Sequence, residues 1–260
     1  MAEPAKLLLG QHAVVTGGGS GIGAAVALAL AQQGAALTLM GRRAERLEAE
    51  ARRIAETTGV AASPLPLDVT DDDAVRSAFI GLKPVDILVN NAGAAQSAPF
   101  AKTGRDLLER MLAVNLKAAF FCTQAVLPAM LKAGRGRIVN IASTAGLTGY
   151  AYVTAYVAAK HALVGLTRAL ALETATRGVT VNAVCPGFTD TELVADAIET
   201  IVAKTKRSPD AARAELARIN PMGRLVTPEE VASAVVFLAL PSASAVTGQA
   251  IVVAGGEVMP

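Results

Sequence analysis

The sequence contains no tryptophan, and aromatic residues occupy only 3% of its 260 positions. Proteins that hold single-stranded nucleic acid stack the bases on exposed aromatic side chains, so this composition argues against that class. The formal net charge is only +2 and charged residues make up 18% of the chain, so no basic face for DNA or for anionic lipid stands out. We therefore expect neither nucleic acid nor a membrane among the partners.

Cysteine and histidine are also scarce, with two of each. Cys122 and Cys185 lie in apolar runs, which is typical of buried thiols in a reducing compartment rather than of disulfides. Because the two histidines are scattered as well, no metal site is predicted. The sequence shows neither a secretory signal nor an apolar run of ~18–20 residues, the length of a membrane helix. The expected location is therefore cytoplasmic.

Short β-branched runs alternate with longer helical patterns along most of the chain. Strands are predicted at 13–16, 37–40, 63–67, 87–90, 137–142, 180–184 and 250–253. Helices are predicted at 22–34, 43–57, 71–79, 105–131, 155–176 and 228–240. Such alternation predicts right-handed crossovers and a parallel sheet with helices on both faces. We therefore expect an α/β fold: one domain, 1–260, with a doubly wound, seven-stranded parallel sheet.

One segment, at about 188–226, interrupts this alternation with two further helical patterns. The run Ser208-Pro209-Asp210 is typical of a helix start, and the run from Thr227 to Glu230 fits a capping box for the next helix. A long excursion within a compact domain is usually functional, so we predict a helical substrate lid. Its cations are either a solvated face or an attraction for a phosphate-bearing substrate such as an acyl-CoA thioester. They are Lys204, Lys206, Arg207, Arg213 and Arg218.

The first predicted strand runs into Thr16-Gly-Gly-Gly-Ser-Gly-Ile-Gly23, and a helix follows at once. Glycines here permit a tight turn and let a pyrophosphate approach the backbone, while the helix N-terminus supplies amides and a positive dipole end. The spacing does not match a P-loop. The motif therefore predicts a dinucleotide site of the Rossmann type, with Gly17, Gly19, Ser20, Gly21, Ile22 and Gly23 against the cofactor.

The second predicted strand ends at Gly41-Arg42-Arg43, where a dinucleotide fold meets the adenosine ribose. An acidic residue here would bind the 2′-hydroxyl, whereas an arginine accommodates a 2′-phosphate. NADP(H) is therefore favoured as cofactor, and NAD(H) stays possible. The alternative is that Arg42 and Arg43 only begin a solvated helix with Glu45 and Glu48.

Tyr156 is followed four residues later by Lys160 within one helical pattern, so both side chains share a helix face. A free tyrosine has a pKa near ~10 and is a poor acid or base at neutral pH. A nearby ammonium is expected to lower that pKa and to make the hydroxyl usable in proton transfer.

With these motifs, the chain resembles the classical short-chain dehydrogenase/reductase family over nearly its whole length. The matching pieces are Thr16 to Gly23, Asp68-Val69, Asn90 to Gly93, Asn115, Ser143, Tyr156 with Lys160, and Pro186-Gly187. Their order and separations also agree, with 28 residues from Asn115 to Ser143 and 13 from Ser143 to Tyr156.

The resemblance implies a role for each matched residue. Tyr156 would be the general acid or base, and Ser143 would hydrogen-bond the reacting oxygen. Lys160 would bind the nicotinamide ribose and depress the tyrosine pKa, and Asn115 would hold a water that relays protons. The remaining implied cofactor contacts are Asp68 and Val69 at the adenine, Asn91 and Gly93 in the groove, and Pro186, Gly187, Thr189 and Thr191 near the carboxamide or phosphates.

Two positions depart from the family pattern. Thr189 stands where isoleucine or valine is usual, which affects local packing beside the carboxamide. Ser20 stands where many NADP(H)-preferring members carry a basic residue, so the 2′-phosphate prediction depends on Arg42 and Arg43.

The resulting expectation is an NADP(H)-dependent oxidoreductase that moves a hydride between the cofactor and a ketone or secondary alcohol. Members acting on 3-oxoacyl thioesters and hydroxyacyl-CoA look most similar, so a CoA or acyl-carrier thioester is one candidate substrate. The resemblance also implies a homotetramer, built partly from the segment 248–260. The rival hypothesis is a catalytically silent dinucleotide-binding sensor or scaffold, and a methyltransferase would leave Tyr156 and Lys160 unexplained.

Overall fold

The computed structural model describes residues 6–259 of the chain. Residues 1–5, most of the stretch inspected for a secretory signal, and Pro260, the end of the expected tetramer segment, lie outside the described part.

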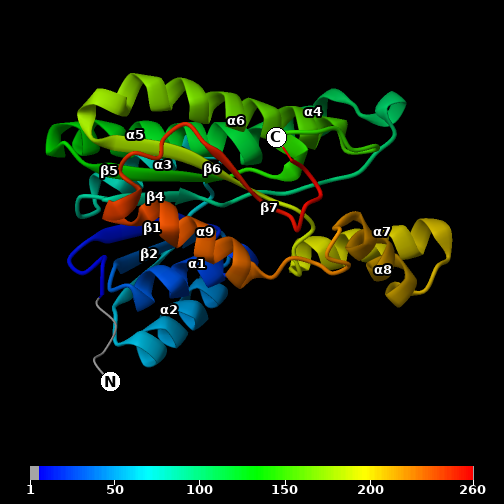
Figure 1. Cartoon of the computed structure of the whole chain (residues 1–260), viewed down its shortest axis with the longest axis horizontal. Helices are drawn as coiled ribbons and strands as arrows, with labels where there is room; N and C mark the ends of the chain where they lie inside the picture. The colour runs from blue at the N-terminus through cyan, green and yellow to red at the C-terminus, as the bar shows by residue number, and fades with distance from the viewer. Residues whose placement is uncertain (1–5, 260) are drawn as a thin grey trace.

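Seven strands form one fully parallel sheet (Figure 1). They are β1 (His12–Thr16), β2 (Ala36–Gly41), β3 (Ala62–Pro66), β4 (Ile87–Asn90), β5 (Gly136–Ile141), β6 (Val179–Pro186) and β7 (Ala250–Val253). Their order is β3-β2-β1-β4-β5-β6-β7, so the direction of winding reverses between β1 and β4. The prediction of a doubly wound, seven-stranded parallel sheet is confirmed. In such sheets ligands bind at the carboxyl ends of the strands beside this reversal.

Helices cover both faces of the sheet (Figure 1). One face carries α1 (Gly21–Gln32), α2 (Ala44–Thr58) and α9 (Pro228–Ala239), and the other carries α3 (Asp72–Ile80), α4 (Arg105–Leu112), α5 (Ala118–Ala133) and α6 (Thr154–Thr174). Alternate strand residues supply the two cores. Val15 packs in the core with α1, α2 and α9, whereas its neighbour Val14 packs in the core with α3 and α5. Burial on both faces explains why the strands read as apolar runs.

A π-helical turn, Ala113–Lys117, joins α4 to α5 and makes one helix from Arg105 to Ala133. The prediction for this region ended two residues earlier, at 131. Such π turns widen a helix locally and are frequent at functional sites. Here the turn carries the buried Asn115.

The same 29-residue helix has the length and apolar composition of a membrane span, with a mean hydropathy of 1.3 in its most apolar window. Core helices pass this test as well, and this one packs on α3, α6 and the sheet. Some of its apolar side chains, among them Cys122, Val126 and Met130, are buried in that packing, whereas Phe120 and Leu108 are exposed.

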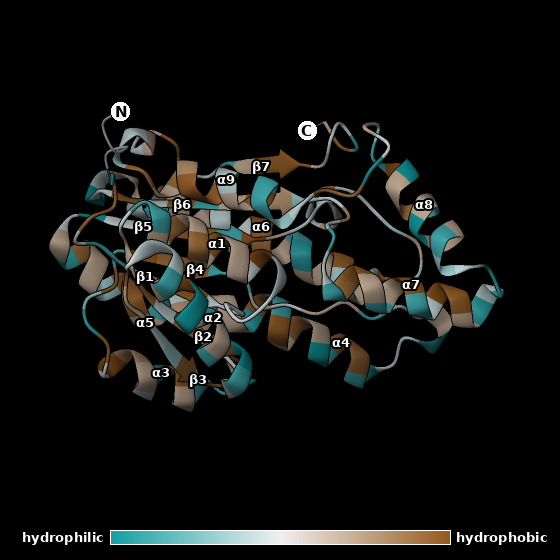
Figure 2. Cartoon of the chain, turned by 90° about the horizontal axis from the view of Figure 1, so that it is seen from below, coloured by the Kyte–Doolittle hydropathy of each residue, from teal (hydrophilic) through white to brown (hydrophobic). Residues whose placement is uncertain are grey.

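The α7–α8 segment, residues 188–226, stands beside the body of the molecule (Figures 1 and 2). It contains the two predicted helices, α7 (Glu192–Thr205) and α8 (Pro209–Ile219). A small core of its own holds them together, formed by Val194, Ile198, Ala212, Leu216 and Leu225. This core is separate from those of the sheet.

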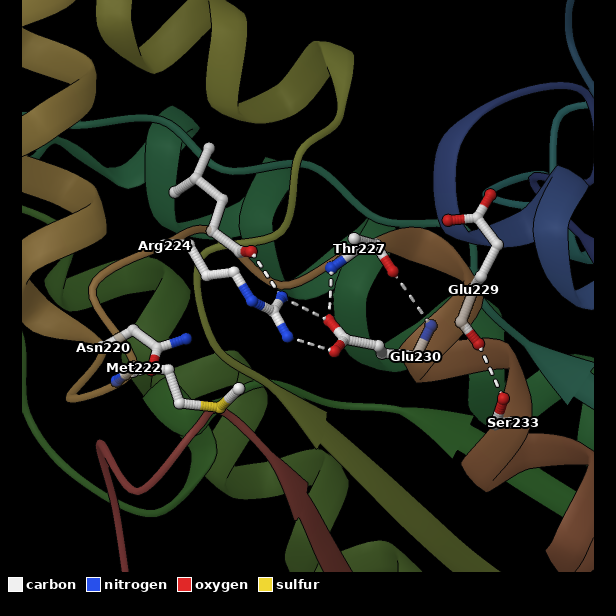
Figure 3. A network of polar contacts seen from close by, with 8 residues as sticks. Asn220, Met222, Arg224, Thr227, Glu229, Glu230 and Ser233 are labelled. Atoms are coloured by element: carbon white, nitrogen blue, oxygen red, sulfur yellow. Dashed lines mark hydrogen bonds and ion pairs between the residues drawn. The ribbon is translucent and has the colours of Figure 1, made fainter.

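The chain returns from this segment through a capping box at the start of α9 (Figure 3). The Thr227 hydroxyl accepts from the Glu230 amide at 3.2 Å, and the Glu230 carboxylate accepts from the Thr227 amide at 2.8 Å. Arg224 binds the same carboxylate through two nitrogens, at 2.8 and 2.5 Å. The Arg224 guanidinium, followed by the Thr227 amide, lowers the pKa of Glu230 to about 2. The predicted capping box is therefore confirmed, and so is the Ser208 cap of α8.

Replacing Thr227 with alanine should lower the free energy of unfolding by about 1 kcal/mol, because the α9 amide of Glu230 loses its acceptor. Urea denaturation followed by circular dichroism measures this change. Thr227→Ser keeps the acceptor oxygen and should stay near wild type. An alanine variant as stable as the wild type would show that the cap contributes nothing.

Candidate active site

The glycine turn between β1 and α1 forms a cradle that side chains would fill. Gly17 and Gly21 have positive φ angles of +66° and +54°, which glycine adopts without strain. A Cβ on Gly23 would lie 2.2 Å from the Gly17 carbonyl oxygen, and a Cβ on Gly17 would lie 2.8 Å from Asn91 Nδ2. The predicted motif thus has the geometry that keeps the backbone accessible.

The N-terminus of α1 points its amides out of this cradle without a side-chain acceptor. Ser20 is the N-cap residue but makes no capping hydrogen bond, and the first turn of α1 carries no acidic residue. Within residues 6–259 the first amides of this helix therefore have no anionic side chain on them. A helix N-terminus whose amides have no side-chain acceptor, next to a glycine turn, is suited to bind a pyrophosphate.

Asn91 and Thr16 tie the ends of β1 and β4 together below the cradle. Asn91 Nδ2 donates to the carbonyls of Thr16 at 2.9 Å and Gly17 at 3.2 Å. The Thr16 hydroxyl accepts from the amides of Asn91 at 2.9 Å and Ala92 at 3.0 Å. The Asn91 side chain thus braces the turn from inside. Thr16 begins the glycine motif, but the motif alone predicted no role for its side chain.

The residues expected at the adenosine end of the groove lie near one another. The Asp68 carboxylate accepts from the Thr70 amide at 2.9 Å and the Thr70 hydroxyl at 2.8 Å, which together hold its pKa low, and the charge of Arg42 adds to this. Arg43 donates to the Ser20 hydroxyl at 3.2 Å. Arg43 is the N-cap residue of α2, and Arg42, Arg43, Glu45 and Glu48 are all exposed, so the alternative of a solvated helix start also fits the structure.

Tyr156 and Lys160 lie together on α6, as their spacing predicts. The Lys160 ammonium is 5.7 Å from the centre of the Tyr156 ring and donates to the Ile141 carbonyl at 2.8 Å. Lys160 is buried, and this burial lowers its pKa to about 8. The end of β5 therefore orients the lysine with a backbone carbonyl.

The predicted lowering of the Tyr156 pKa is wrong for this structure. Burial raises the pKa of Tyr156, and a hydrogen bond with the Ser143 hydroxyl acts in the opposite direction without cancelling it. Desolvation disfavours a phenolate, while the Lys160 ammonium is directed at Ile141 rather than at the tyrosine oxygen. The buried phenol is thus kept protonated at neutral pH.

Asn115 fastens the loop after β4 to the π turn. Its Nδ2 donates to the carbonyls of Ala94 at 2.8 Å and Met111 at 3.0 Å, and its Oδ1 accepts from the Ala94 amide at 3.3 Å. A Cβ on Gly93 would lie 2.9 Å from that oxygen and 3.6 Å from Lys160 Nζ. Gly93 therefore leaves open the space between Asn115 and Lys160.

Ser143 lies at the end of β5 and begins a short 3₁₀ turn, where its hydroxyl accepts from the Ala145 amide at 3.1 Å. With Tyr156, Lys160 and Asn115 it completes the predicted set of four, which the fold brings together at the carboxyl ends of β4 and β5.

Thr189 and Thr191 join the α7–α8 segment to the groove. Thr189 is buried and forms an isolated parallel bridge with Val226, and its hydroxyl donates to the Gly187 carbonyl at 3.0 Å. The Thr191 methyl lies 3.2 Å from where a Cβ on Gly21 would be. The segment thus begins directly on the glycine turn.

A polar cluster that sequence reasoning missed lies beside Ser143. The Tyr150 hydroxyl is 2.8 Å from the Thr144 hydroxyl and donates to Glu257 Oε1 through a short contact. Glu257 Oε2 is buried without a partner among the described atoms, and a Cβ on Gly187 would lie 2.5 Å from it. Tyr150 has no lysine four residues later, so the spacing that indicates Tyr156 gives Tyr150 no role. The only signal for Glu257 was a charge in the apolar segment after the last strand.

Two of the five cations of the α7–α8 segment pair with carboxylates of the same segment. Arg207 pairs with Glu215, and Arg213 binds Asp190 through two nitrogens, at 3.1 and 2.6 Å. For these two residues the contacts match the alternative of a solvated face.

Comparison with known proteins gives the same picture over nearly the whole chain. The family model described as short chain dehydrogenase matches residues 11–201. The 3-oxoacyl-[acyl-carrier-protein] reductase of Aquifex aeolicus is 39% identical over 96% of this chain and 98% of its own length.

Two solved structures are similar throughout. A candidate NAD(P)-dependent gluconate 5-dehydrogenase from Beutenbergia cavernae, with NADP bound at low occupancy, is 41% identical, covers 98% of this chain and 99% of its own, and superimposes with a TM-score of 0.88. A variant of the actinorhodin polyketide ketoreductase with NADPH is 38% identical, covers 95% of this chain and 97% of its own, and has a TM-score of 0.91. The chain therefore belongs to the short chain dehydrogenase family of oxidoreductases.

Proposed function

We propose that the protein transfers a hydride between NADP(H) and a ketone or secondary alcohol, with Tyr156 as the general acid or base. The observation that carries the proposal is the convergence of Tyr156, Ser143, Lys160 and Asn115 beside the glycine turn. A protein that only binds a dinucleotide needs the glycine turn but not this convergence, which argues against a silent sensor or scaffold.

The raised pKa keeps the Tyr156 phenol in the protonated form that the reductive direction requires, although it also makes the phenol a weaker acid. A buried phenol that stays protonated at neutral pH gives its proton to the carbonyl oxygen as the reduced nicotinamide supplies the hydride. Ser143 donates a second hydrogen bond to that oxygen. Lys160 binds the nicotinamide ribose hydroxyls, and Asn115 holds the neighbouring loop and a relaying water. Gly93 leaves the space for this water, because no side chain fills it.

The residues predicted from the sequence would hold NADP(H) along its length. The amides of the glycine turn, with Thr191, would hold the pyrophosphate. Asp68 and Val69 would contact the adenine, and Arg42 and Arg43 would bind the 2′-phosphate. Pro186, Gly187 and Thr189 would line the nicotinamide end. The bound NADP and NADPH of the two similar structures support this choice over NAD(H).

The substrate class follows from the chemistry that the relatives share. The names of the three similar proteins all describe oxidation of a secondary alcohol or reduction of a ketone. A 3-oxoacyl thioester on CoA or an acyl carrier is one candidate. We further propose that 1–260 is one catalytic domain, that the α7–α8 segment is its substrate lid, and that the protein acts as a cytoplasmic homotetramer.

Tyr156→Phe should reduce kcat by at least about 100-fold and leave the Kd for NADPH within about twofold, because it removes only the proton donor. Nicotinamide absorbance with a panel of ketones, 3-oxoacyl thioesters and alcohols measures turnover, and cofactor fluorescence measures binding. Tyr152→Phe, at an exposed tyrosine in the turn just before α6, is the matched control and should remain active. Full activity in the Tyr156 variant would refute the mechanism, and cofactor binding without turnover of any substrate would favour the silent sensor.

Arg42→Ala should weaken NADP⁺ binding by about 10-fold and NAD⁺ binding far less, since a charge-assisted hydrogen bond to the 2′-phosphate is lost. Isothermal titration calorimetry with both cofactors measures the two constants. Arg52→Ala, an exposed arginine further along α2, should change neither. Equal losses for both cofactors would remove the argument for a 2′-phosphate site.

Lys160 should make stability depend on pH above 8 in the cofactor-free protein. Its pKa is about 8 when folded and 10.5 when exposed, so between these values the unfolded chain binds more protons and stability rises with pH. The stability of the wild type relative to Lys160→Met should therefore increase by about 2 to 3 kcal/mol between pH 7 and pH 10. Urea denaturation at both pH values measures it, and a difference that does not change with pH would contradict the buried charge.

A further inference from the structure

Glu192, the first residue of α7, reaches across the groove to the arginines beside the adenosine end. Its Oε2 is 3.4 Å from Arg43 NH1, and its Oε1 forms a close ion pair with Arg46 NH1. The partners are 149 and 146 residues apart in sequence, so this carboxylate connects the α7–α8 segment to the start of α2. The contact joins two parts of the molecule that have separate cores.

The Arg43 guanidinium makes two polar contacts at once. One of its terminal nitrogens donates to Ser20 in the glycine turn at 3.2 Å, while the other faces Glu192. Its guanidinium thus spans the space between the turn and the end of β2, next to Arg42. This is the space in which a phosphate on the adenosine ribose would lie.

Carboxylates and phosphates bind a guanidinium in the same way, through parallel N–H···O hydrogen bonds. Arg46, followed by Arg43, holds the pKa of Glu192 below its usual value, so the carboxylate is ionised throughout the neutral range. Glu192 therefore presents to Arg43 a negative charge and one acceptor oxygen, as a 2′-phosphate would, although it contacts this arginine through a single oxygen at 3.4 Å.

We propose that Glu192 is a specificity-determining residue that competes with the 2′-phosphate of the cofactor for Arg43. The inference rests on the proposed binding of NADP(H) and deepens it. NADP(H) must displace this carboxylate from the arginine, whereas NAD(H) leaves the ion pair intact. Glu192 accordingly reduces the ratio of NADP(H) affinity to NAD(H) affinity that Arg42 and Arg43 create.

The strengths of the two interactions make such an exchange feasible. The side chains of Glu192 and Arg43 are both more than half exposed, and exposed ion pairs contribute little to stability. A phosphate monoester carries about two negative charges and three acceptor oxygens, so it binds a guanidinium more strongly than a carboxylate does. The ion pair is therefore weak enough to be displaced and strong enough to reduce the measured affinity.

The test compares 2′,5′-ADP with 5′-AMP, two fragments that differ only in the 2′-phosphate. Calorimetry gives the ratio of their dissociation constants in the wild type and in Glu192→Gln. The ratio in favour of 2′,5′-ADP should rise by about two- to fivefold in the variant, as expected for loss of one exposed competing pair. Glu199→Gln removes the same charge from the same helix two turns away and should leave the ratio unchanged.

A second pair of variants identifies the arginine. In an Arg43→Ala background, the change from Glu192 to glutamine should no longer raise the ratio, because the group for which the anions compete is gone. A gain that persists there, or an equal gain in Glu199→Gln, would overturn competition at Arg43. A Glu192→Gln ratio equal to that of the wild type would also overturn it.

The fragments contain no nicotinamide, so this result does not depend on hydride transfer. A raised ratio in a protein that turns over no carbonyl substrate would refute the proposed reaction and support the role of Glu192. Turnover with NADPH together with an unchanged ratio would support the proposed reaction and refute the role of Glu192. A purely structural role for the ion pair would lower the melting temperature without changing the ratio of the two fragments.

Discussion

The hydrogen bonds that tie β1 to β4 are the constraint on which the rest of the site depends. These two strands flank the point where the winding of the sheet reverses, and their carboxyl ends would otherwise be free to separate. Thr16 and Asn91 close that gap with backbone and side-chain hydrogen bonds. The glycine turn can then be tight, because its inner side is already occupied by the Asn91 amide. The glycine turn therefore leaves its outer backbone atoms free of side chains, while the Asn91 amide occupies its inner side.

A buried chain of side-chain hydrogen bonds connects the end of β4 to the helices on the face of the sheet that α5 and α6 cover. Asn90 Nδ2 donates to Thr123 on α5 at 3.0 Å and to Asn140 on β5 at 2.8 Å, and Asn140 donates to Thr167 on α6 at 2.9 Å. Buried polar groups of this kind are costly unless they are paired, so they favour one arrangement of the two helices. That arrangement sets α5 with its π turn, and α6 with Tyr156 and Lys160, against the ends of β4 and β5. The positions of Asn115 and of the tyrosine are thus consequences of the same core.

The α7–α8 segment meets the body by small contacts. Its own core is separate, and its attachments to the body include the packing of Thr191 on the glycine turn, the edge contact of Phe188 with Tyr150, the close approach of Asn220 to Gly255 and the ion pairs of Glu192. Ion pairs at such a boundary respond to a charged ligand, whereas buried packing would not.

Much of the fold and the candidate site could be predicted from the sequence, since both depend on local pattern. All seven strands were predicted within two residues of their observed ends, and the central ones are continuous apolar runs because they are buried on both faces. The glycine turn was predictable from steric demand, and Tyr156 with Lys160 from the period of a helix. Boundaries such as the end of α6 were less accurate, because residues 175–177 form a 3₁₀ turn before the left-handed Gly178.

Only the tertiary structure decided the electrostatics of the site. Spacing predicted that Lys160 would lower the pKa of Tyr156, but desolvation by the surrounding atoms raises it, and the ammonium is directed at Ile141. Glu257 beside Tyr150, and Glu192 on Arg43 and Arg46, join residues more than a hundred positions apart. Short-range pattern determines which elements form, because steric fit and hydrophobic period act between near neighbours. Burial and charge act through space, so they are determined only once the chain has folded.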